Sequence, residues 1–425
     1  IWFNLNRAIR SNFCNRMSKL ETITIDTPSG SNTMQIGSTN TATINLGVSG
    51  DTINVPAGVT IANAGTSTGF GDSLRPNVQP LIINGNMAVA QRGTSFTGVS
   101  SGSNFPVDRF EFYPTNLGAY TIIQEALTSG EAYNNGFRTA LRIDTTTADA
   151  SPSSTDYAIL RYKFEGQDLQ LFKKGTSNAE KFTLAFWVKS NKTTTGQVNL
   201  FDIDNSRLVS GTYTISSANT WEKKVINFPA DTTGAFDNNN ALSLVVEFFL
   251  DGGSNWTSGT APTAWEAKSN GDRLANNFAI GSSTDNDFAI TGVQLEVGEF
   301  SSTTLPPFQH ESFADNLQRC MRYYQNSYKL GNNLTSTSSN NAIIVTSWND
   351  GNCPFPNMFP VPMRDAPTVT LRPRGSTSTG QINSNGAAKS ATATDTSEKG
   401  VSYLTVSSGT ALVYCGFTFE LETEL

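Results

Sequence analysis

The sequence predicts an all-β protein, and its composition and its residue patterns both indicate this. Only 15% of the 425 residues are charged, and Ser, Thr, Asn and Gly are abundant instead. These residues populate turns, and Thr also suits strands. Short runs of alternating apolar and polar residues recur, with turn clusters such as 232–240 between them. One stretch, 306–325, has helical spacing, and the length suits about three domains.

Composition argues against several classes of function. The formal net charge of −7 is the wrong sign for general nucleic-acid binding, which needs a basic face. No run approaches the about 18 apolar residues of a membrane span, so membrane insertion is not expected. The cysteines, Cys14, Cys320, Cys353 and Cys415, are far apart and form no CxxC zinc motif. We interpret Cys320 and Cys415 as buried free thiols, as in a chain assembled in a reducing cytoplasm.

The chain opens with an extension, residues 1–20, that shows no secretory signal. For residues 1–16, upstream translated sequence and a docking peptide both remain open. Residues 21–65 then repeat a short motif, as in Thr43-Ile44-Asn45 and Thr52-Ile53-Asn54. One copy cannot close a core, so we expect three chains to wind into an intertwined stalk of at most about 150 Å. The alternative is a flexible linker. Residues 66–80 are a linker.

Residues 81–305 predict a jelly-roll β-sandwich, because many short strands are separated by turn clusters. Residues 242–250 are apolar enough for a strand that is buried on both faces. The strand candidates are 81–83, 109–113, 120–125, 139–144, 158–164, 182–188, 198–203, 221–228, 242–250, 278–280 and 288–297.

Residues 306–325 predict a short linking helix. Two prolines precede it, and Ser312 caps it with Asp315 three residues later. Arg319 and Arg322 lie in the later turns, where the helix dipole favours cations. One apolar stripe comprises Phe313, Leu317, Cys320, Met321 and Tyr324.

Residues 326–425 predict a second, smaller β domain, and we expect neighbouring chains to complete its core. Its strand candidates are 341–347, 368–372, 401–406 and 411–420. A proline-rich crossing, 355–367, cannot be a central strand. Residues 374–399 are polar and predict turns.

The residues offer little for catalysis. The single histidine, His310, precedes the helix and predicts a packing role rather than a catalytic one. No phosphate-binding or dinucleotide-binding motif occurs in a strand–helix setting. The acidic pairs Asp202/Asp204 and Asp285/Asp287 border turns, which favours solvated turn residues or a structural calcium ion. We therefore expect no enzyme activity and no cofactor beyond that calcium.

Aromatic residues carry the binding signal, because the apolar face of a sugar stacks on Trp or Tyr. Trp187 and Trp221 lie in strand patterns and predict core positions. Loop tryptophans are candidates for binding, and the alternative is that each folds back to cap the sandwich edge. The candidate carbohydrate-binding residues are Asn255, Trp256 and Trp265, and, in the last domain, Trp348, Asn349 and Asp350.

Several motifs together resemble a known family. Residues 84–93 (NGNMAVAQRG) with 108–110 (DRF), then 182–190 and 290–298, resemble a jelly-roll module of phage tail-fibre proteins. That module is itself similar to carbohydrate-binding modules. The helix resembles the segment that follows the module, and residues 359–370 resemble the terminal domain of such fibres. Ala90 stands where the family often has Trp.

The resemblance implies a structural virion protein, a tail fibre or other appendage that attaches the particle to a bacterial surface receptor, a glycan or a protein. It implies a homotrimer, assembled in the host cytoplasm, that binds other tail or capsid proteins through its N-terminal part. We expect recognition in 326–425, assisted by loop 251–266. The alternatives are a polysaccharide depolymerase tailspike, a head-mounted decoration fibre and a secreted adhesin.

Overall fold

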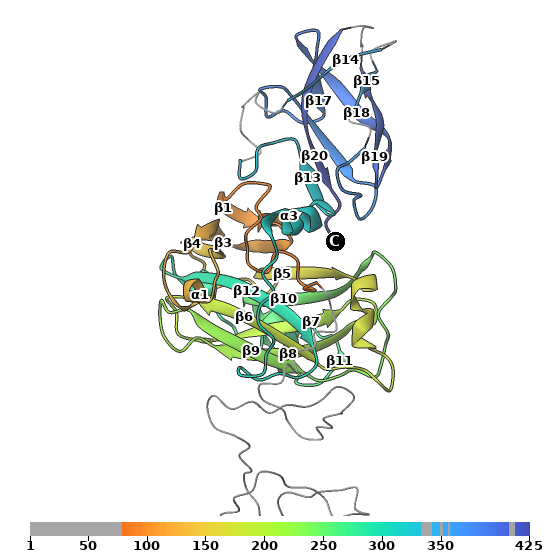
Figure 1. The fold of residues 1–425 in the computed structure, drawn as a ribbon. Coiled ribbons are helices and arrows are strands. Elements are labelled where there is room, and N and C mark those ends of the chain that lie inside the picture. The colour runs from red at the N-terminus through yellow and green to blue at the C-terminus, as the bar shows by residue number, and fades with distance from the viewer. Residues whose placement is uncertain (1–78, 333–341, 349–351, 356–357, 408–412) are drawn as a thin grey trace, which may run out of the picture. The chain divides into compact units, whose positions relative to one another are not determined.

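The computed structural model describes residues 79–332, 342–348, 352–355, 358–407 and 413–425 (Figure 1). The chain divides into two units, residues 1–67 and 68–425, and all described residues belong to the second. The predicted extension and stalk, and the linker up to residue 78, lie outside the described residues. The described part is built from antiparallel β-sheets, which confirms the all-β prediction.

The first sheet curls into the jelly-roll sandwich. Its hydrogen-bonded order is β11-β8-β7-β10-β5-β3-β4-β12-β6-β9, with β1 and β2 also paired to β3. The two edges of the sheet come together where β8, next to the edge strand β11, approaches β9 at the other edge. Gly211 of β8 lies so close to Ile226 of β9 that a Cβ added to the glycine would be 2.4 Å from it. We call this contact the seam of the jelly roll. The strands are β1 (Ser95–Ser101), β2 (Asn104–Val107), β3 (Phe110–Ala126), β4 (Thr139–Thr147), β5 (Tyr157–Glu165), β6 (Phe182–Lys189), β7 (Thr195–Asp202), β8 (Arg207–Thr214), β9 (Glu222–Phe228), β10 (Leu242–Gly252), β11 (Glu266–Ala267) and β12 (Asp287–Val297).

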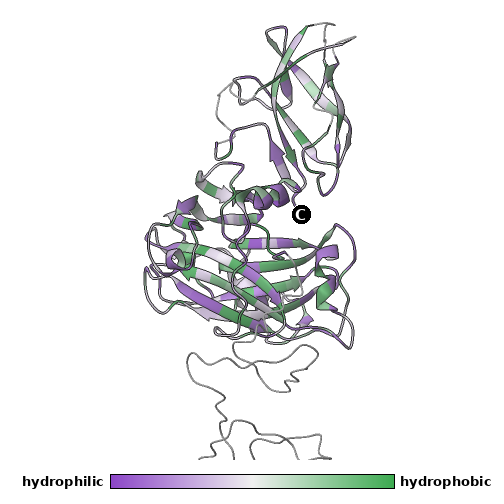
Figure 2. Ribbon diagram, viewed as in Figure 1, coloured by the Kyte–Doolittle hydropathy of each residue, from purple (hydrophilic) through white to green (hydrophobic). Residues whose placement is uncertain are grey.

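Apolar and polar residues alternate along the strands, and this alternation decides which face of the sheet packs in the core. Figure 2 shows hydrophobic and hydrophilic residues interspersed along the strands. In β5, Leu160 and Tyr162 belong to the large core, whereas Ile159, Arg161 and Lys163 line the opposite face. β10 is buried along almost its whole length, as the sequence predicted. The neighbouring strands β5 and β7 both run antiparallel to it.

Some strand predictions are wrong. Residues 81–83 and 278–280 form no strand, although Ile82 and Phe278 are buried, because they fill the core from turns. The two candidates 109–113 and 120–125 belong to one long strand, β3. The strands β1, β8 and β11 were missed because their residues are mostly polar or small, and β2 was missed because it has only four residues, one of them a proline.

Short helices connect the strands. They are α1 (Glu131–Asn134), α2 (Ser254–Thr257), α3 (Phe313–Met321), η2 (Gly166–Phe172), η3 (Gly271–Leu274) and η4 (Ile280–Ser282). The predicted cap of α3 is confirmed: the N–H of Asp315 donates to Ser312 Oγ at 3.1 Å. The predicted apolar stripe is too wide, because Phe313 is exposed while Cys320 and Tyr324 are buried.

The second sheet follows α3. Its order is β13-β20-β17-β18-β19-β15, with β14 and β16 also paired to β20. The prediction of turns over 374–399 is wrong, since β17 and β18 form a hairpin there. Asn385 and Gly386 both have positive φ at its turn, as a two-residue hairpin requires. The strands are β13 (Tyr324–Asn326), β14 (Ile343–Thr346), β15 (Cys353–Pro354), β16 (Thr368–Pro373), β17 (Gln381–Ser384), β18 (Ala387–Ser397), β19 (Gly400–Val406) and β20 (Tyr414–Glu422).

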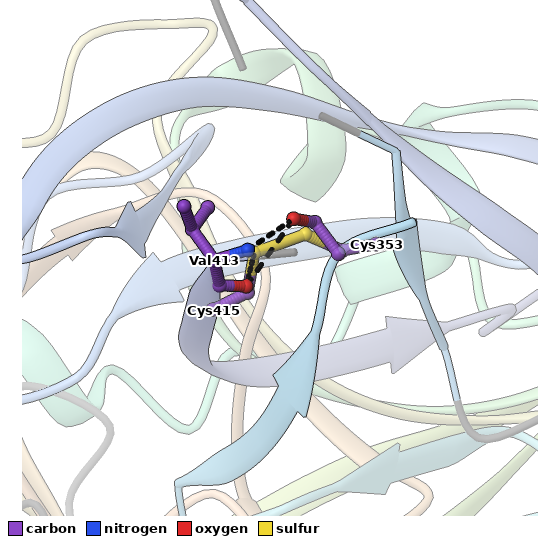
Figure 3. Close-up of a disulfide and its surroundings, with 4 residues drawn as sticks. Cys353, Val413 and Cys415 are labelled. Carbon is purple, nitrogen blue, oxygen red and sulfur yellow. Dashed lines mark hydrogen bonds between the residues drawn. A yellow bond between two sulfur atoms is a disulfide. The ribbon is translucent and has the colours of Figure 1, made fainter. Parts of the chain in front are cut away.

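A disulfide crosses the core of the second sheet (Figure 3). It joins Cys353 to Cys415, whose Cα atoms are 6.8 Å apart and whose sequence separation is 62 residues. The prediction that Cys415 is a free thiol is therefore wrong, because β20 brings it beside the two-residue strand β15, which gave no local signal. Cys320 is buried and free, as predicted.

Candidate functional site

A groove of about 320 Å³ lies on the outer face of β5, β7 and β10. The outward positions of these strands form its floor, and the loop that carries α2 and η3 forms one wall. The lining residues are Tyr157, Ile159, Arg161, Lys163, Phe201, Ile203, Leu242, Val245, Glu247, Phe249, Trp256, Arg273 and Leu425.

Aromatic rings pack together at one side of the groove, where Trp256 and Tyr157 line it and Tyr113 lies behind Tyr157. Trp256, half-buried on α2, packs edge-on against Tyr157 with ring centroids 5.0 Å apart. Its Nε1 donates a hydrogen bond to the carbonyl of Thr155 at 3.3 Å, which fixes the orientation of the indole. Tyr157 in turn stacks on Tyr113 at 6.0 Å with an interplanar angle of 11°. These packed rings therefore have little rotamer freedom to lose on binding.

Two arginines stand among these rings, and each is held by a carboxylate. The Cζ of Arg273 lies 5.1 Å from the centroid of Trp256, and its guanidinium donates two hydrogen bonds to Glu247. Arg161 donates to both oxygens of Glu111, at 2.5 and 3.1 Å. Such two-point pairing fixes the plane of a guanidinium. The groove thus carries oriented hydrogen-bonding groups beside its rings.

The carboxylate of Glu111 is held strongly in its charged form. Burial alone would raise its pKa, but hydrogen bonds from Arg161 and the charges of Arg161 and Lys163 lower it from 4.5 to about 2. The ammonium of Lys163 lies 2.9 Å from Glu111 Oε2. Burial lowers the pKa of Lys163 itself, and the charge of Glu111 opposes this effect.

Buried amides fasten the wall of the groove to its floor. Gln197 and Asn199 on β7 are fully buried. Gln197 Nε2 donates to the carbonyl of Asp272 at 2.7 Å, and Asn199 Nδ2 donates to the carbonyl of Arg273 at 2.9 Å. Because η3 is held in this way, Arg273 keeps its place next to Trp256.

The structure separates the predicted binding residues. Trp256 lines the groove, and Asn255 beside it is exposed. Trp265 belongs to the core and is only 8% exposed, and its Nε1 donates to the carbonyl of Pro229 at 2.8 Å. It therefore offers no open face and caps the sandwich, which was the alternative interpretation.

The candidates in the last domain lie apart from the groove. Trp348 follows β14, is 40% exposed, and its ring centroid lies 6.0 Å from that of Tyr403. Asn349 and Asp350 lie outside the described residues.

Sequence reasoning missed Tyr157, Arg161 and Arg273. A signal was present in β5 (YAILRYKFE), where one set of alternate positions is apolar and the other carries Tyr, Arg and Lys. That pattern indicates a strand whose outward face is polar and aromatic rather than simply solvated. The loop residue Arg273 had no such signal.

The other polar candidates have structural roles. Asp202 is not a solvated turn residue, because it is buried and paired with Lys174 at 2.6 Å. Within the described ranges, no group of three or more His, Cys, Asp or Glu residues could hold a metal ion. His310 packs against Phe137 and Phe308, with ring centroids 5.1 and 4.9 Å away, as predicted. No helix in the described part of the chain is long and apolar enough to span a membrane.

Trp187 and Trp221 are buried in a small cluster beside the main core, as predicted.

Comparison with known proteins gives resemblances of fold to about half of the chain. The enzymatically active domain of tailspike protein 4 of bacteriophage CBA120 is 13% identical with a TM-score of 0.27, over 51% of this chain and 21% of that one. A putative sugar binding protein from Bacteroides thetaiotaomicron is 15% identical with a TM-score of 0.28, over 52% of this chain and 100% of that one. A family 11 carbohydrate-binding module from Clostridium thermocellum is 10% identical with a TM-score of 0.24, over 49% of this chain and 98% of that one.

The chain thus covers only 21% of the length of the tailspike structure. No protein-family model matches the chain, and no curated protein matches it. At these identities and TM-scores the likenesses carry no conclusion about function.

Proposed function

We propose that the protein is an attachment protein of a virus particle and that its jelly roll binds a glycan of the bacterial surface in the groove described above. The observation that carries the proposal is the cluster of Trp256, Tyr157 and Arg273. A sugar ring has an apolar C–H face that stacks on Trp or Tyr, and hydroxyl groups that accept hydrogen bonds from a guanidinium. The groove combines both features on rigid supports. The motifs in 84–93 and 182–190, which resemble phage tail-fibre modules, support the virion assignment.

Binding at one groove is expected to be weak. Stacking on a single indole contributes about 1 kcal/mol, and both arginines of the groove are already paired with carboxylates. Three copies in one particle-bound fibre would raise the overall avidity by orders of magnitude, about 10²–10⁴. The proposal therefore includes the homotrimer and an anchored N-terminal part.

We propose binding without hydrolysis. A retaining or inverting glycosidase needs one carboxyl group that holds a proton as general acid. Glu111 cannot do this near neutral pH because its pKa is about 2. Glu247, the carboxylate on the floor of the groove, is clamped by Arg273. These contacts favour a lectin-like role over that of a depolymerase.

The second sheet is the alternative recognition surface. Trp348 is 40% exposed there, which favours a contact with the receptor at this residue. Binding of the full chain to immobilised bacterial surface polysaccharides, measured by biolayer interferometry, separates the two candidates. We expect Trp256→Ala to weaken binding about fivefold, the equivalent of one stacking contact, and Trp256→Phe to weaken it less. Phe313→Ala, which removes an exposed ring outside the groove, is the control and should bind as the wild type does. If Trp348→Ala alone weakens binding, the groove assignment is wrong.

A further inference from the structure

The second sheet leaves the jelly roll and returns to it at the same place. β13 follows α3, and the end of β20 pairs with it antiparallel, so that Tyr324 faces Glu422 and Asn326 faces Glu420. One step further, the N–H of Ser327 donates to the carbonyl of Phe419 at 3.1 Å. The chain thus leaves the jelly roll along β13 and comes back to it along the neighbouring strand β20.

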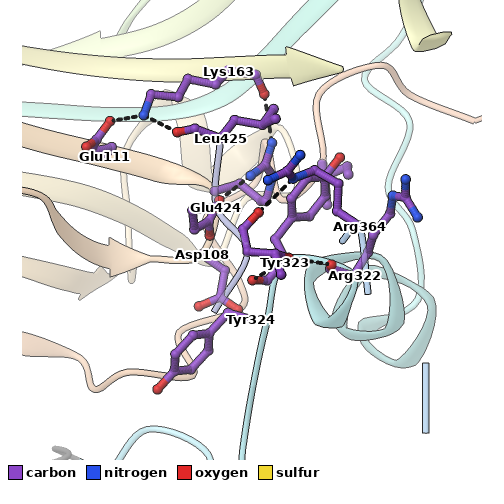
Figure 4. A network of polar contacts seen from close by, with 12 residues as sticks. Asp108, Glu111, Lys163, Arg322, Tyr323, Tyr324, Arg364, Glu424 and Leu425 are labelled. Atoms are coloured by element: carbon purple, nitrogen blue, oxygen red, sulfur yellow. Dashed lines mark hydrogen bonds and ion pairs between the residues drawn. The ribbon is translucent and has the colours of Figure 1, made fainter. Parts of the chain in front are cut away.

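After β20 the chain runs back onto the jelly roll. We call residues 423–425 the returning segment; Figure 4 shows its polar contacts. The N–H of Thr423 donates to the carbonyl of Tyr323 at 2.8 Å. Glu424 forms ion pairs with Arg109 and, at 3.3 Å, with Arg92. The Nζ of Lys163 donates to the carbonyl of Leu425.

The arginines at this contact are buried, so the stability of the fold depends on their being paired with carboxylates. Arg92 and Arg109 are 5% and 2% exposed, and each guanidinium lies over a tyrosine ring that follows α3. The Cζ of Arg109 is 3.3 Å from the centroid of Tyr323, and that of Arg92 is 3.6 Å from the centroid of Tyr324. Among the described residues, Glu424 is the carboxylate paired with Arg109. Removing it would leave a buried, unpaired cation, which strongly destabilises a fold.

The returning segment also reaches the groove. Leu425 is one of the lining residues. Lys163, which donates to the carbonyl of Leu425, is also paired with Glu111 at 2.9 Å. The ammonium of Lys163 is therefore held between the floor of the groove and the returning segment.

We propose that residues 79–326 and the returning segment, 423–425, form one folding unit, into which residues 327–422 are inserted, and that the returning segment positions Lys163 at one end of the groove. The role of Lys163 in binding rests on the proposed glycan function, whereas the folding unit does not. The boundary at residue 326 expected from the sequence would then cut through this unit.

Hydrogen–deuterium exchange of the full chain tests the folding unit. Leu404→Ala weakens the core of the second sheet, and Leu160→Ala weakens the core of the jelly roll. We expect residues 423–425 to keep their protection in Leu404→Ala while β17 to β19 exchange faster. In Leu160→Ala they should lose protection together with β3 and β5. If residues 423–425 instead follow β17 to β19, the proposal is wrong.

The ion pair is tested separately, with a milder variant in case the first one unfolds. Glu424→Gln should make β3 and β5 exchange about tenfold faster and leave β18 unchanged. Thr423→Val should do the same more weakly, because it loses only the hydroxyl contacts to the carbonyls of Arg322 and Tyr323. Glu299→Gln, in an exposed pair with Lys181, is the matched control and should change nothing. Unchanged exchange of β3 and β5 in both test variants would contradict the proposal.

The binding part has its own readout. Lys163→Met in the full chain should weaken binding to the polysaccharide that the wild type binds, and hydrogen–deuterium exchange should show that the jelly roll remains folded. If it binds as the wild type does, Lys163 has no role in the groove. If the wild type binds no polysaccharide, the proposed function and the role of Lys163 both fail, whereas the exchange experiments still decide the folding unit.

Discussion

The ion pairs under the groove make a quantitative prediction about acid stability. Burial opposes the charge of Glu111, yet Arg161 and Lys163 lower its pKa from 4.5 in the unfolded chain to about 2 in the folded one. A folded-state pKa below the unfolded value gives stability that is present above the unfolded pKa and is lost as the pH falls through the folded pKa. This difference corresponds to about 3 kcal/mol of unfolding free energy at neutral pH.

The test compares the wild type with Glu111→Gln, which keeps the shape of the side chain but has no charge. Urea unfolding at neutral pH should show the variant less stable by about 3 kcal/mol. The difference in stability should shrink steadily as the pH is lowered from 4.5 toward 2, because the Glu111 carboxylate of the unfolded wild-type chain takes up a proton in this range while that of the folded chain stays charged. Glu299→Gln, from an exposed ion pair, should show a gap below about 1 kcal/mol. The reasoning is refuted if Glu111→Gln unfolds with the same free energy as the wild type at neutral pH. It is also refuted if the difference in unfolding free energy is the same at pH 4.5 and at pH 2.

The other predictions concern the second sheet, the seam of the jelly roll and the stalk. Reducing the disulfide, which spans 62 residues, should destabilise the second sheet by about 4 kcal/mol, as monitored by Trp348 fluorescence; identical unfolding with and without reductant would contradict this. Gly211→Val should lower the stability of the jelly roll by about 1–3 kcal/mol in calorimetry, because the Cβ of the valine would lie 2.4 Å from Ile226. An unchanged melting temperature would show that β8 and β9 can move apart at this point without strain. Light scattering should find a trimer, and Ile53→Asp should reduce its size; a stable wild-type monomer at micromolar concentration would exclude the trimer, and an unchanged trimer in the variant would place assembly outside the stalk.

Strong local patterns made parts of this fold predictable. The long apolar run of β10 is a buried central strand, and Ser312 caps α3 as its spacing indicated. Predictions failed where contacts distant in sequence decide the structure. The pairing of Cys353 with Cys415 depends on how β20 passes the short strand β15, which no local pattern reveals. The hairpin of β17 and β18 was missed because polar residues hid its strands, although Asn385-Gly386 is a recognised hairpin turn.

The candidate site was only partly predictable for the same reason. Trp256 could be selected because it lies in a polar loop, and the structure places it in the groove. Trp265 lies in the same loop but is buried, since its partners in the core come from other strands. Arg273 completes the site through contacts with β7 and β10 that only the folded chain brings together.

The central claim is that the jelly-roll groove, and not the second sheet, holds the glycan. Fluorine NMR of the full chain labelled with 5-fluorotryptophan tests it directly, with each resonance assigned by a Trp→Phe variant. On titration with a bacterial surface polysaccharide that the protein binds, the account predicts that the resonance of Trp256 shifts, because the sugar ring would lie against its indole. The resonances of the buried Trp187 and Trp265 should stay in place. A shift of the Trp348 resonance without any shift of the Trp256 resonance would contradict the account.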